Sequence, residues 1–173
     1  MDDEKQDSRE GAKNAKTAKN FNVEDISAIV VDAAFHIHKG LGPGLLESVY
    51  ETVLARSLNK RGLAVERQRI ISFEYDGMRF EDGLRVDLLV EGRLIIELKS
   101  VENFAPVHAK QVLTYLRLLQ LPLGLLINFG APTFKEGVRR IVNQHKDFAS
   151  SRLRVNQEGL TRSHEEREDG LDF

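Results

Sequence analysis

Residues 86–99 read VDLLVEGRLIIELK, and this stretch decides the fold. Two apolar segments of strand length flank the dipeptide EG at 91–92, a composition typical of a β-hairpin. Each segment carries one acidic residue, Asp87 in the first and Glu97 in the second. Because side chains alternate along a strand, Glu97 and Lys99 share one face of the sheet. Charges on a mostly buried strand need a partner or a metal ion.

The length of the hairpin loop decides whether the two acidic residues meet. A two-residue loop pairs Asp87 with Ile96 and places the two carboxylates on opposite faces of the sheet. A three-residue loop, with Gly92 in a left-handed conformation, shifts the register by one residue and unites Asp87 with Glu97. We therefore expect a bulged or irregular hairpin.

Two convergent carboxylates can bind Mg²⁺, which prefers oxygen ligands and usually keeps several waters. A neighbouring lysine such as Lys99 can stabilise developing negative charge or help to deprotonate a water. Two simpler interpretations stay open. In one, the strand reaches the protein surface at Glu97 and Lys99, where charged side chains are solvated. In the other, Asp87 and Lys99 form an ion pair that needs no metal.

Outward from the hairpin, hydrophobic periodicity and turn residues predict an ordered series of elements. We expect helices over 22–40 and 45–61, strands over 65–75, 78–80, 85–90 and 93–98, a helix from Pro106, and a strand over 123–129. Residues 138–142 fit a short strand or a helix. In the second helix, the side chains expected to face inward are Leu46, Val49, Tyr50, Val53, Leu54 and Leu58. This order predicts an α/β fold with a four- to five-stranded mixed sheet flanked by helices.

Composition sets limits on the class of protein. The chain has 173 residues, no cysteine and a formal net charge of −2. Residues 1–20 and 152–173 are polar and predict disordered tails around one domain at 21–151. That domain carries sixteen acidic and sixteen basic side chains, so it has no basic excess for indiscriminate phosphate binding. We expect a soluble, cytoplasmic protein without a secretory signal or membrane span.

Two helices present further polar groups. Glu47 shares a helical face with Tyr50 and Glu51, although the helix dipole alone would favour an acid in a first turn. His108, Gln111 and Tyr115 lie at i, i+3 and i+7 on the later helix, which also fits a solvated edge with Tyr115 packed. His36 and His38 are two residues apart on a helix, so they point in different directions and make a poor metal pair.

Four segments together resemble a known family. They are GLLESVY at 44–50, VDLLVEGRLIIELKS at 86–100, the Gln111-x-x-x-Tyr115 helix and LLINFG at 125–130. This combination is similar to the GxxExxY family of the PD-(D/E)XK nuclease superfamily, on the branch that shares a Q-x-x-x-Y helix with recombination-associated exonucleases. The likeness covers roughly residues 23–145. It implies a restriction-endonuclease-like core, a Mg²⁺ or Mn²⁺ cofactor and DNA as the partner.

The resemblance also implies roles for particular residues. Asp87 and Glu97 would be the principal metal ligands, with the backbone carbonyl of Leu98 as a further ligand. Glu47 would complete or orient the metal shell, and Lys99 would position the attacking water or offset charge. One departure is that Val86, and not proline, precedes Asp87; this proline is often absent in the superfamily, so the departure alters little.

The helix that begins at Pro106 carries the groups to which the resemblance gives a substrate-binding role. Gln111 and Tyr115 would line the site and contact DNA phosphates or Lys99. His108 is the histidine nearest the expected site, and a phosphate contact is its candidate role.

Three functions are consistent with these features. The first is a divalent-metal-dependent nuclease that hydrolyses DNA phosphodiester bonds. Such a nuclease can act as a homodimer. The second is a catalytically silent nucleic-acid-binding or complex-assembly module that retains the nuclease fold. The third, a small-molecule enzyme, would need a closed apolar pocket beside Glu97.

Overall fold

The computed structural model describes residues 21–143 and 153–155. Its elements follow in the order α1 (Val23–Leu41), α2 (Glu47–Lys60), β1 (Val65–Tyr75), β2 (Met78–Val90), β3 (Leu94–Lys99), α3 (Pro106–Leu118), β4 (Leu123–Asn128), β5 (Val138–Val142) and β6 (Leu153–Val155). The expected tails at 1–20 and 152–173 lie outside the described residues, except for the three residues of β6.

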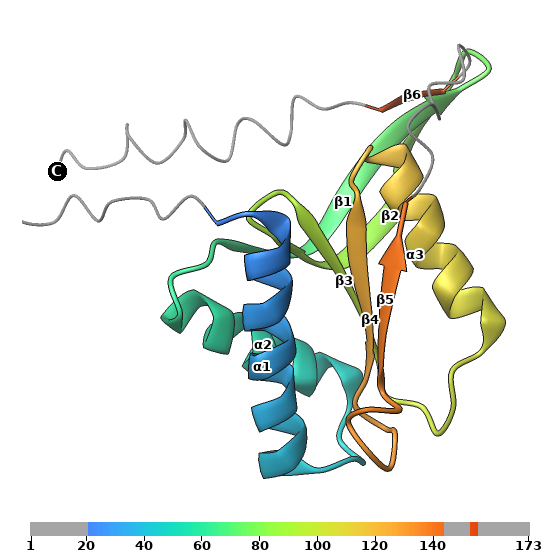
Figure 1. The fold of residues 1–173 in the computed structure, drawn as a ribbon. Helices are drawn as coiled ribbons and strands as arrows, with labels where there is room; N and C mark the ends of the chain where they lie inside the picture. Colours follow the sequence, from blue (N-terminus) through green and yellow to red (C-terminus); the bar gives the residue numbers. More distant parts are fainter. Residues whose placement is uncertain (1–20, 144–152, 156–173) are drawn as a thin grey trace, which may run out of the picture.

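The strands form one mixed sheet in the order β5-β4-β3-β2-β1-β6 (Figure 1). The pair β3 and β4 is parallel, and the other pairs are antiparallel. Helix α3 provides the crossover that a parallel pair requires. The expected mixed α/β sheet is confirmed. Two details differ: β2 is one continuous strand where two shorter ones were expected, and with β6 the sheet has six strands where four to five were expected. Residues 138–142, which fitted a strand or a helix, form a strand.

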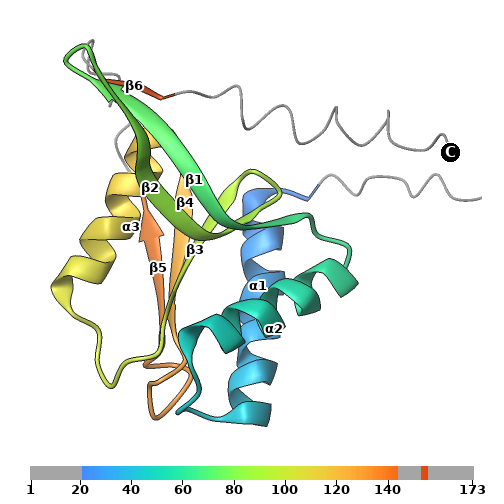
Figure 2. The same cartoon turned by 180° about the vertical axis from the view of Figure 1, so that it is seen from behind.

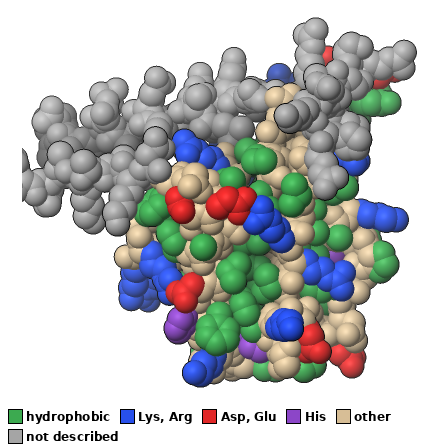
Figure 3. Space-filling model, viewed as in Figure 1, with side chains coloured by type: hydrophobic (Ala, Val, Ile, Leu, Met, Phe, Trp, Pro, Cys, Tyr) green, Lys and Arg blue, Asp and Glu red, His purple; other side chains and the backbone are tan. Residues whose placement is uncertain are grey.

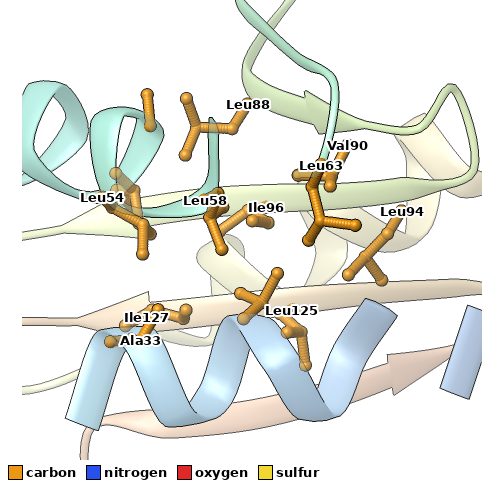
Figure 4. Packing of buried hydrophobic residues seen from close by; sticks show 14 of the residues in the cluster. Ala33, Leu54, Leu58, Leu63, Leu88, Val90, Leu94, Ile96, Leu125 and Ile127 are labelled. Carbon is orange, nitrogen blue, oxygen red and sulfur yellow. The ribbon is translucent and has the colours of Figure 1, made fainter. Parts of the chain in front are cut away.

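Helices cover the sheet on both sides, α1 and α2 on one face and α3 on the other (Figures 1 and 2). Alternation along β4 shows how the strand serves both layers: Leu125 and Ile127 pack with α1 and α2, whereas Leu126 packs with α3. Figure 4 shows side chains of the α1–α2 layer, including Leu54 and Leu58, meeting those of β2, β3 and β4. The sheet is therefore the middle layer of three.

Tyr50 fixes the loop that leads into α2. Its hydroxyl donates to the carbonyl of Gly42 at 2.6 Å and accepts from the N–H of Leu45 at 3.2 Å. Its ring stacks on Phe129 with a centroid separation of 4.4 Å and an interplanar angle of 3°. Because Tyr50 is fully buried in the first turn of α2, it also fixes the position of Glu47, three residues earlier at the start of the helix.

The inward stripe expected for the second helix is wrong at its start. Leu46 is 74% exposed and Val49 is 38% exposed. Helix α2 begins at Glu47, and Leu46 is its N-cap with an extended conformation, φ −63° and ψ 144°. The helical period therefore does not reach back to Leu46. Tyr50, Leu54 and Leu58 are buried as expected.

An open groove of about 670 Å³ lies along α1, on the side shown in Figure 3. Its lining comprises Glu24, Ser27, Ala28, Val31, Asp32, Phe35, Phe134 and Arg140. None of the expected site residues lines it. Among the described residues, no helix is both long enough and apolar enough to pass through a bilayer.

Candidate active site

The hairpin between β2 and β3 has the three-residue loop that the carboxylate pair requires. Leu88 pairs with Ile96 and Val90 with Leu94, so the same register places Asp87 opposite Glu97. Glu91 and Gly92 both have left-handed conformations, with φ of 52° and 61°. The expectation of an irregular hairpin with a left-handed Gly92 is confirmed. The two acidic residues share one face because they lie directly opposite each other.

Asp87 is tied to both neighbouring strands. Its Oδ2 accepts the backbone N–H of Leu98 on β3 at 2.8 Å, and its Oδ1 accepts from the amide of Gln68 on β1 at 3.4 Å. Burial raises the pKa of Asp87, and the hydrogen bond from Leu98 and the charge of Lys99 lower it by less. The carboxylate is therefore held in place and poorly solvated, which favours binding of a cation.

Glu97 is the most buried acidic side chain among the expected site residues, at 2% exposure. Its Oε1 accepts from Nζ of Lys99 at 2.6 Å. Among the described residues, its Oε2 is buried without a hydrogen-bond partner. Burial first, and then the charge of Asp87, raise the pKa of Glu97 to about 7. A buried carboxylate oxygen without a partner is costly, so this oxygen needs a cation or a proton.

Lys99 contacts two of the expected metal ligands at once. Its ammonium donates to Glu97 and, at 2.8 Å, to the backbone carbonyl of Leu98. Burial by itself lowers the pKa of Lys99, but the hydrogen bond to Glu97 and the charges of Glu97, Glu47 and Asp87 raise it by more. The net direction is upward, so Lys99 is a cation at neutral pH. It provides the positive charge that a metal ion would otherwise supply to these two oxygens.

Glu47 lies in the first turn of α2, close enough for its charge to be felt by Glu97 and Lys99. Burial raises its pKa, and a backbone hydrogen bond from Ser100 is among the contributions that lower it. Ser100 also donates through its hydroxyl to the carbonyl of Leu45 at 2.7 Å. The end of β3 and the start of α2 are thus joined, which explains why an acid at position 47 can serve a site on β3.

Two further polar residues belong to the site, and sequence reasoning did not assign them to it. Glu51, 5% exposed, accepts from Nε of Arg67 at 2.8 Å and from the amide of Gln68 at 2.7 Å. Gln68 lies opposite Asp87 in the β1–β2 register and has a left-handed φ of 49°. A positive φ is uncommon for a non-glycine residue and costs free energy. Gln68 therefore links Glu51 to Asp87 through a strained backbone position.

The residues expected to bind substrate lie on α3 and contact one another. Gln111 donates from its amide to the hydroxyl of Tyr115 at 2.8 Å. Tyr115 is 8% exposed and packs in the α3 cluster, so its ring is a core group. Nδ1 of His108 accepts from the N–H of Ala105 at 3.2 Å and caps the helix. In a neutral ring this bond leaves Nε2 as the protonated nitrogen.

The expected set of metal ligands is brought together only in part. Within residues 21–143 and 153–155, no three His, Asp or Glu side chains form a ready metal-binding group. The fit to a divalent cation rests on Asp87 and Glu97, which offer oxygen atoms on one sheet face, one of them buried without a partner. Mg²⁺ commonly uses one or two carboxylates and completes its shell with water and phosphate. The donor set therefore suits such an ion.

A comparison with models of protein families identifies the superfamily of the chain. The family model for the PD-(D/E)XK nuclease superfamily matches residues 24–141. The chain belongs to this superfamily, and its α/β fold is restriction-endonuclease-like as expected. No curated protein and no solved structure matches the chain.

Proposed function

We propose that the protein is a divalent-metal-dependent nuclease that hydrolyses DNA phosphodiester bonds. The observation that carries the proposal is the pairing of Asp87 with the buried Glu97, whose Oε2 has no partner among the described residues, beside the cationic Lys99. Membership of a nuclease superfamily supports the same activity. A purely structural ion pair would not require a second buried carboxylate in the same place.

Asp87 and Glu97 would hold Mg²⁺ or Mn²⁺, with Glu47 as a third acidic group at the start of α2. When bound, the ion would supply positive charge at the scissile phosphate. The carbonyl of Leu98 already accepts from Lys99, so a metal ion bound there would share this oxygen with the ammonium.

The chain's own residues account for the remaining steps. Lys99 can orient a water for in-line attack and offset the negative charge that grows on the phosphate oxygens. His108, with Nε2 protonated, can donate to a neighbouring phosphate. Gln111 is half-buried, and its bond to Tyr115 limits the orientations of its amide. Tyr115 thus positions Gln111 and need not touch DNA itself.

We also propose the narrower placement in the GxxExxY family. Gly44 has a φ of 109°, which favours glycine, and Tyr50 binds the loop that contains it. Glu47 lies between them and near Glu97 and Lys99. Each of the three fixed positions of the motif, Gly44, Glu47 and Tyr50, therefore has its own structural role. Cytoplasmic location and a homodimer stay predictions.

The test is incubation of the full chain with labelled DNA in single-stranded, blunt duplex and circular forms, with Mn²⁺ and with EDTA. We expect DNA cleavage in the presence of Mn²⁺ and none in EDTA. The Glu97→Ala and Lys99→Ala variants should not cleave DNA. The matched controls are Glu102→Ala and Lys110→Ala, which remove exposed charges outside the site. Cleavage that survives Glu97→Ala would show that another site or a contaminant is responsible.

A second candidate is the catalytically silent module. It is favoured by one observation: Lys99 already occupies Glu97 Oε1 and the Leu98 carbonyl, so the metal-free site is partly self-neutralised. Calorimetry with Mg²⁺ and Mn²⁺ separates the two. DNA binding without any metal binding would favour the silent module. The small-molecule enzyme is less well supported, because the groove along α1 contains none of the site carboxylates.

A further inference from the structure

Four exposed apolar side chains belong to segments that meet beside the candidate active site, and we call them the apolar rim. They come from the start of α2, the segment after β3 and the first turn of α3. Their exposed fractions are 41% for Leu45, 74% for Leu46, 37% for Val101 and 60% for Val107. In Figure 2 the starts of α2 and α3 lie on either side of the chain that leaves β3. Exposed apolar side chains that lie next to one another can form a binding surface.

Hydrogen bonds link two members of the rim to the site. The carbonyl of Leu45 accepts from Ser100, the residue after Lys99. Val101 follows, and the buried side chain of Asn128 holds its backbone by accepting from its N–H at 3.0 Å and donating to its carbonyl at 2.7 Å. A Cβ on Gly130 would lie 2.4 Å from the carbonyl of Val101, so glycine is required for this approach. The segment after β3 is therefore fixed by a dedicated set of contacts.

The other two members are next to residues of the site in sequence. Leu46 precedes Glu47, and Val107 precedes His108. The charge of Lys99 contributes to lowering the pKa of His108, after burial, which places the first turn of α3 near β3. The segments that carry Leu46 and Val107 therefore lie near the carboxylates.

Charge gives little help in holding a phosphate backbone here. Residues 21–143 carry fifteen acidic and fifteen basic side chains. Beside the site, Lys99 is paired with Glu97 and Arg67 with Glu51. Duplex DNA, which presents mainly phosphates, would gain little from this surface.

We propose that the apolar rim binds unpaired bases, so that the substrate is a single strand or a frayed end and not intact duplex. This inference rests on the proposed nuclease function and specifies its substrate. Unpaired bases expose apolar faces that a duplex keeps stacked, and apolar side chains can contact them irrespective of sequence. Leu46, the most exposed member, contributes most to this binding.

The experiment compares cleavage and binding in separate assays of the full chain. Cleavage with Mn²⁺ is measured on one labelled sequence as a single strand, as a blunt duplex, and as a duplex with unpaired ends. Binding is measured in EDTA with a single strand that contains 2-aminopurine, whose fluorescence rises when the base leaves its stacked neighbours. The variants are Leu46→Ser and Val107→Ser. The control is Leu41→Ser, at the end of α1, where the side chain is 48% exposed.

We expect the single strand to be cut at least about tenfold faster than the blunt duplex, and Leu46→Ser to weaken single-strand binding about tenfold. Leu41→Ser should change neither. Equal cleavage of both forms, or equal effects of Leu46→Ser and Leu41→Ser, would overturn the inference and leave the nuclease function standing. If no DNA is cut but 2-aminopurine fluorescence rises and depends on Leu46, the nuclease function fails and base binding stands. If neither signal appears, both fall.

Discussion

The backbone N–H of Leu98 donates a hydrogen bond to Oδ2 of Asp87 at 2.8 Å, so β3 itself orients the carboxylate that stands opposite Glu97. The same oxygen cannot turn freely toward solvent. This contact exists only because the hairpin register brings the two strands into that alignment. The following predictions depend on the site that results.

In the metal-free protein, Glu97→Gln should be more stable than the wild type by an amount that grows as pH rises. The pKa of Glu97 is about 7, against an ordinary value of 4.5. Between these values the folded chain keeps a proton that the unfolded chain has lost, so the free energy of unfolding falls with rising pH. The variant does not show this fall. The difference between its free energy of unfolding and that of the wild type should increase by up to about 3 kcal/mol from pH 4.5 to pH 7.5. Urea denaturation in EDTA measures it, with Glu102→Gln as control. A gain that is the same at both pH values would contradict the prediction.

Mg²⁺ affinity should rise with pH up to about pH 7 and then level off. Glu97 must release its proton to bind a cation, and its pKa is about 7. Below that value the affinity should increase by up to about tenfold per pH unit. Calorimetry in two buffers of different ionisation enthalpy should detect close to one proton released per ion at pH 6. Affinity that does not change between pH 5.5 and pH 7 would remove Glu97 from the ligand set.

Lys99→Ala should separate metal binding from catalysis. The substitution removes the ammonium that contacts Glu97 Oε1 and the Leu98 carbonyl, so more ligand capacity is left for a metal. We expect several-fold tighter Mn²⁺ binding together with cleavage reduced by about a hundredfold or more. Lys110→Ala should alter neither quantity. Weaker Mn²⁺ binding in Lys99→Ala would mean that the lysine supports the metal site and does not compete for it.

Gln68→Ala should impair the site beyond its effect on the backbone. Gln68 bridges Glu51 and Asp87, and its φ is 49°. Gln120 has a similar φ of 55°, is exposed and lies at the end of α3, so Gln120→Ala removes a left-handed glutamine away from the site. We expect both variants to show similar melting temperatures, with cleavage reduced about tenfold in Gln68→Ala alone. Equal activities would show that the bridge is structural.

Gly92→Ala should destabilise the fold by about 1 kcal/mol, because an L-residue is strained in a left-handed conformation. Gly92 has a φ of 61°, and no atom lies within 4 Å of the position that a Cβ would occupy. The cost is therefore conformational and not steric. Gly92→Asn should cost less, since asparagine tolerates this region. Chemical denaturation of both variants gives the comparison. Equal stability of wild type and Gly92→Ala would mean that the loop adapts to another conformation.

Local patterns were enough to predict much of the fold and the central pair of acids. Strand alternation placed Glu97 and Lys99 together, and the loop argument identified the one register in which Asp87 joins them. The apolar run at 123–129 correctly indicated a strand covered on both faces. These features depend on residues within about one hairpin or one strand of each other.

The features that sequence reasoning missed depend on contacts between distant segments or on small shifts of an element's end. Gln68 meets Glu51 and Asp87 across separations of 17 and 19 residues, and its left-handed conformation has no local signal. Leu46 fits the spacing of the inward-facing residues of the helix in the sequence, but the helix begins one residue later. Strand β6 has only three residues, too few for its alternation to stand out in the polar segment that contains it.

The β1–β2 and β2–β3 hairpins differ in a way that bears on how their loops can be edited. At Asp76-Gly77 the turn has two residues, and Tyr75 pairs with Met78. An insertion there would lengthen an exposed tip far along the β1–β2 ribbon. Adding or removing a single residue between Val90 and Leu94 would instead turn one acidic side chain to the other face of the sheet. For grafting, tagging or recombination, the first turn is an open position, and the second is a fixed-length spacer whose residue count matters more than its composition.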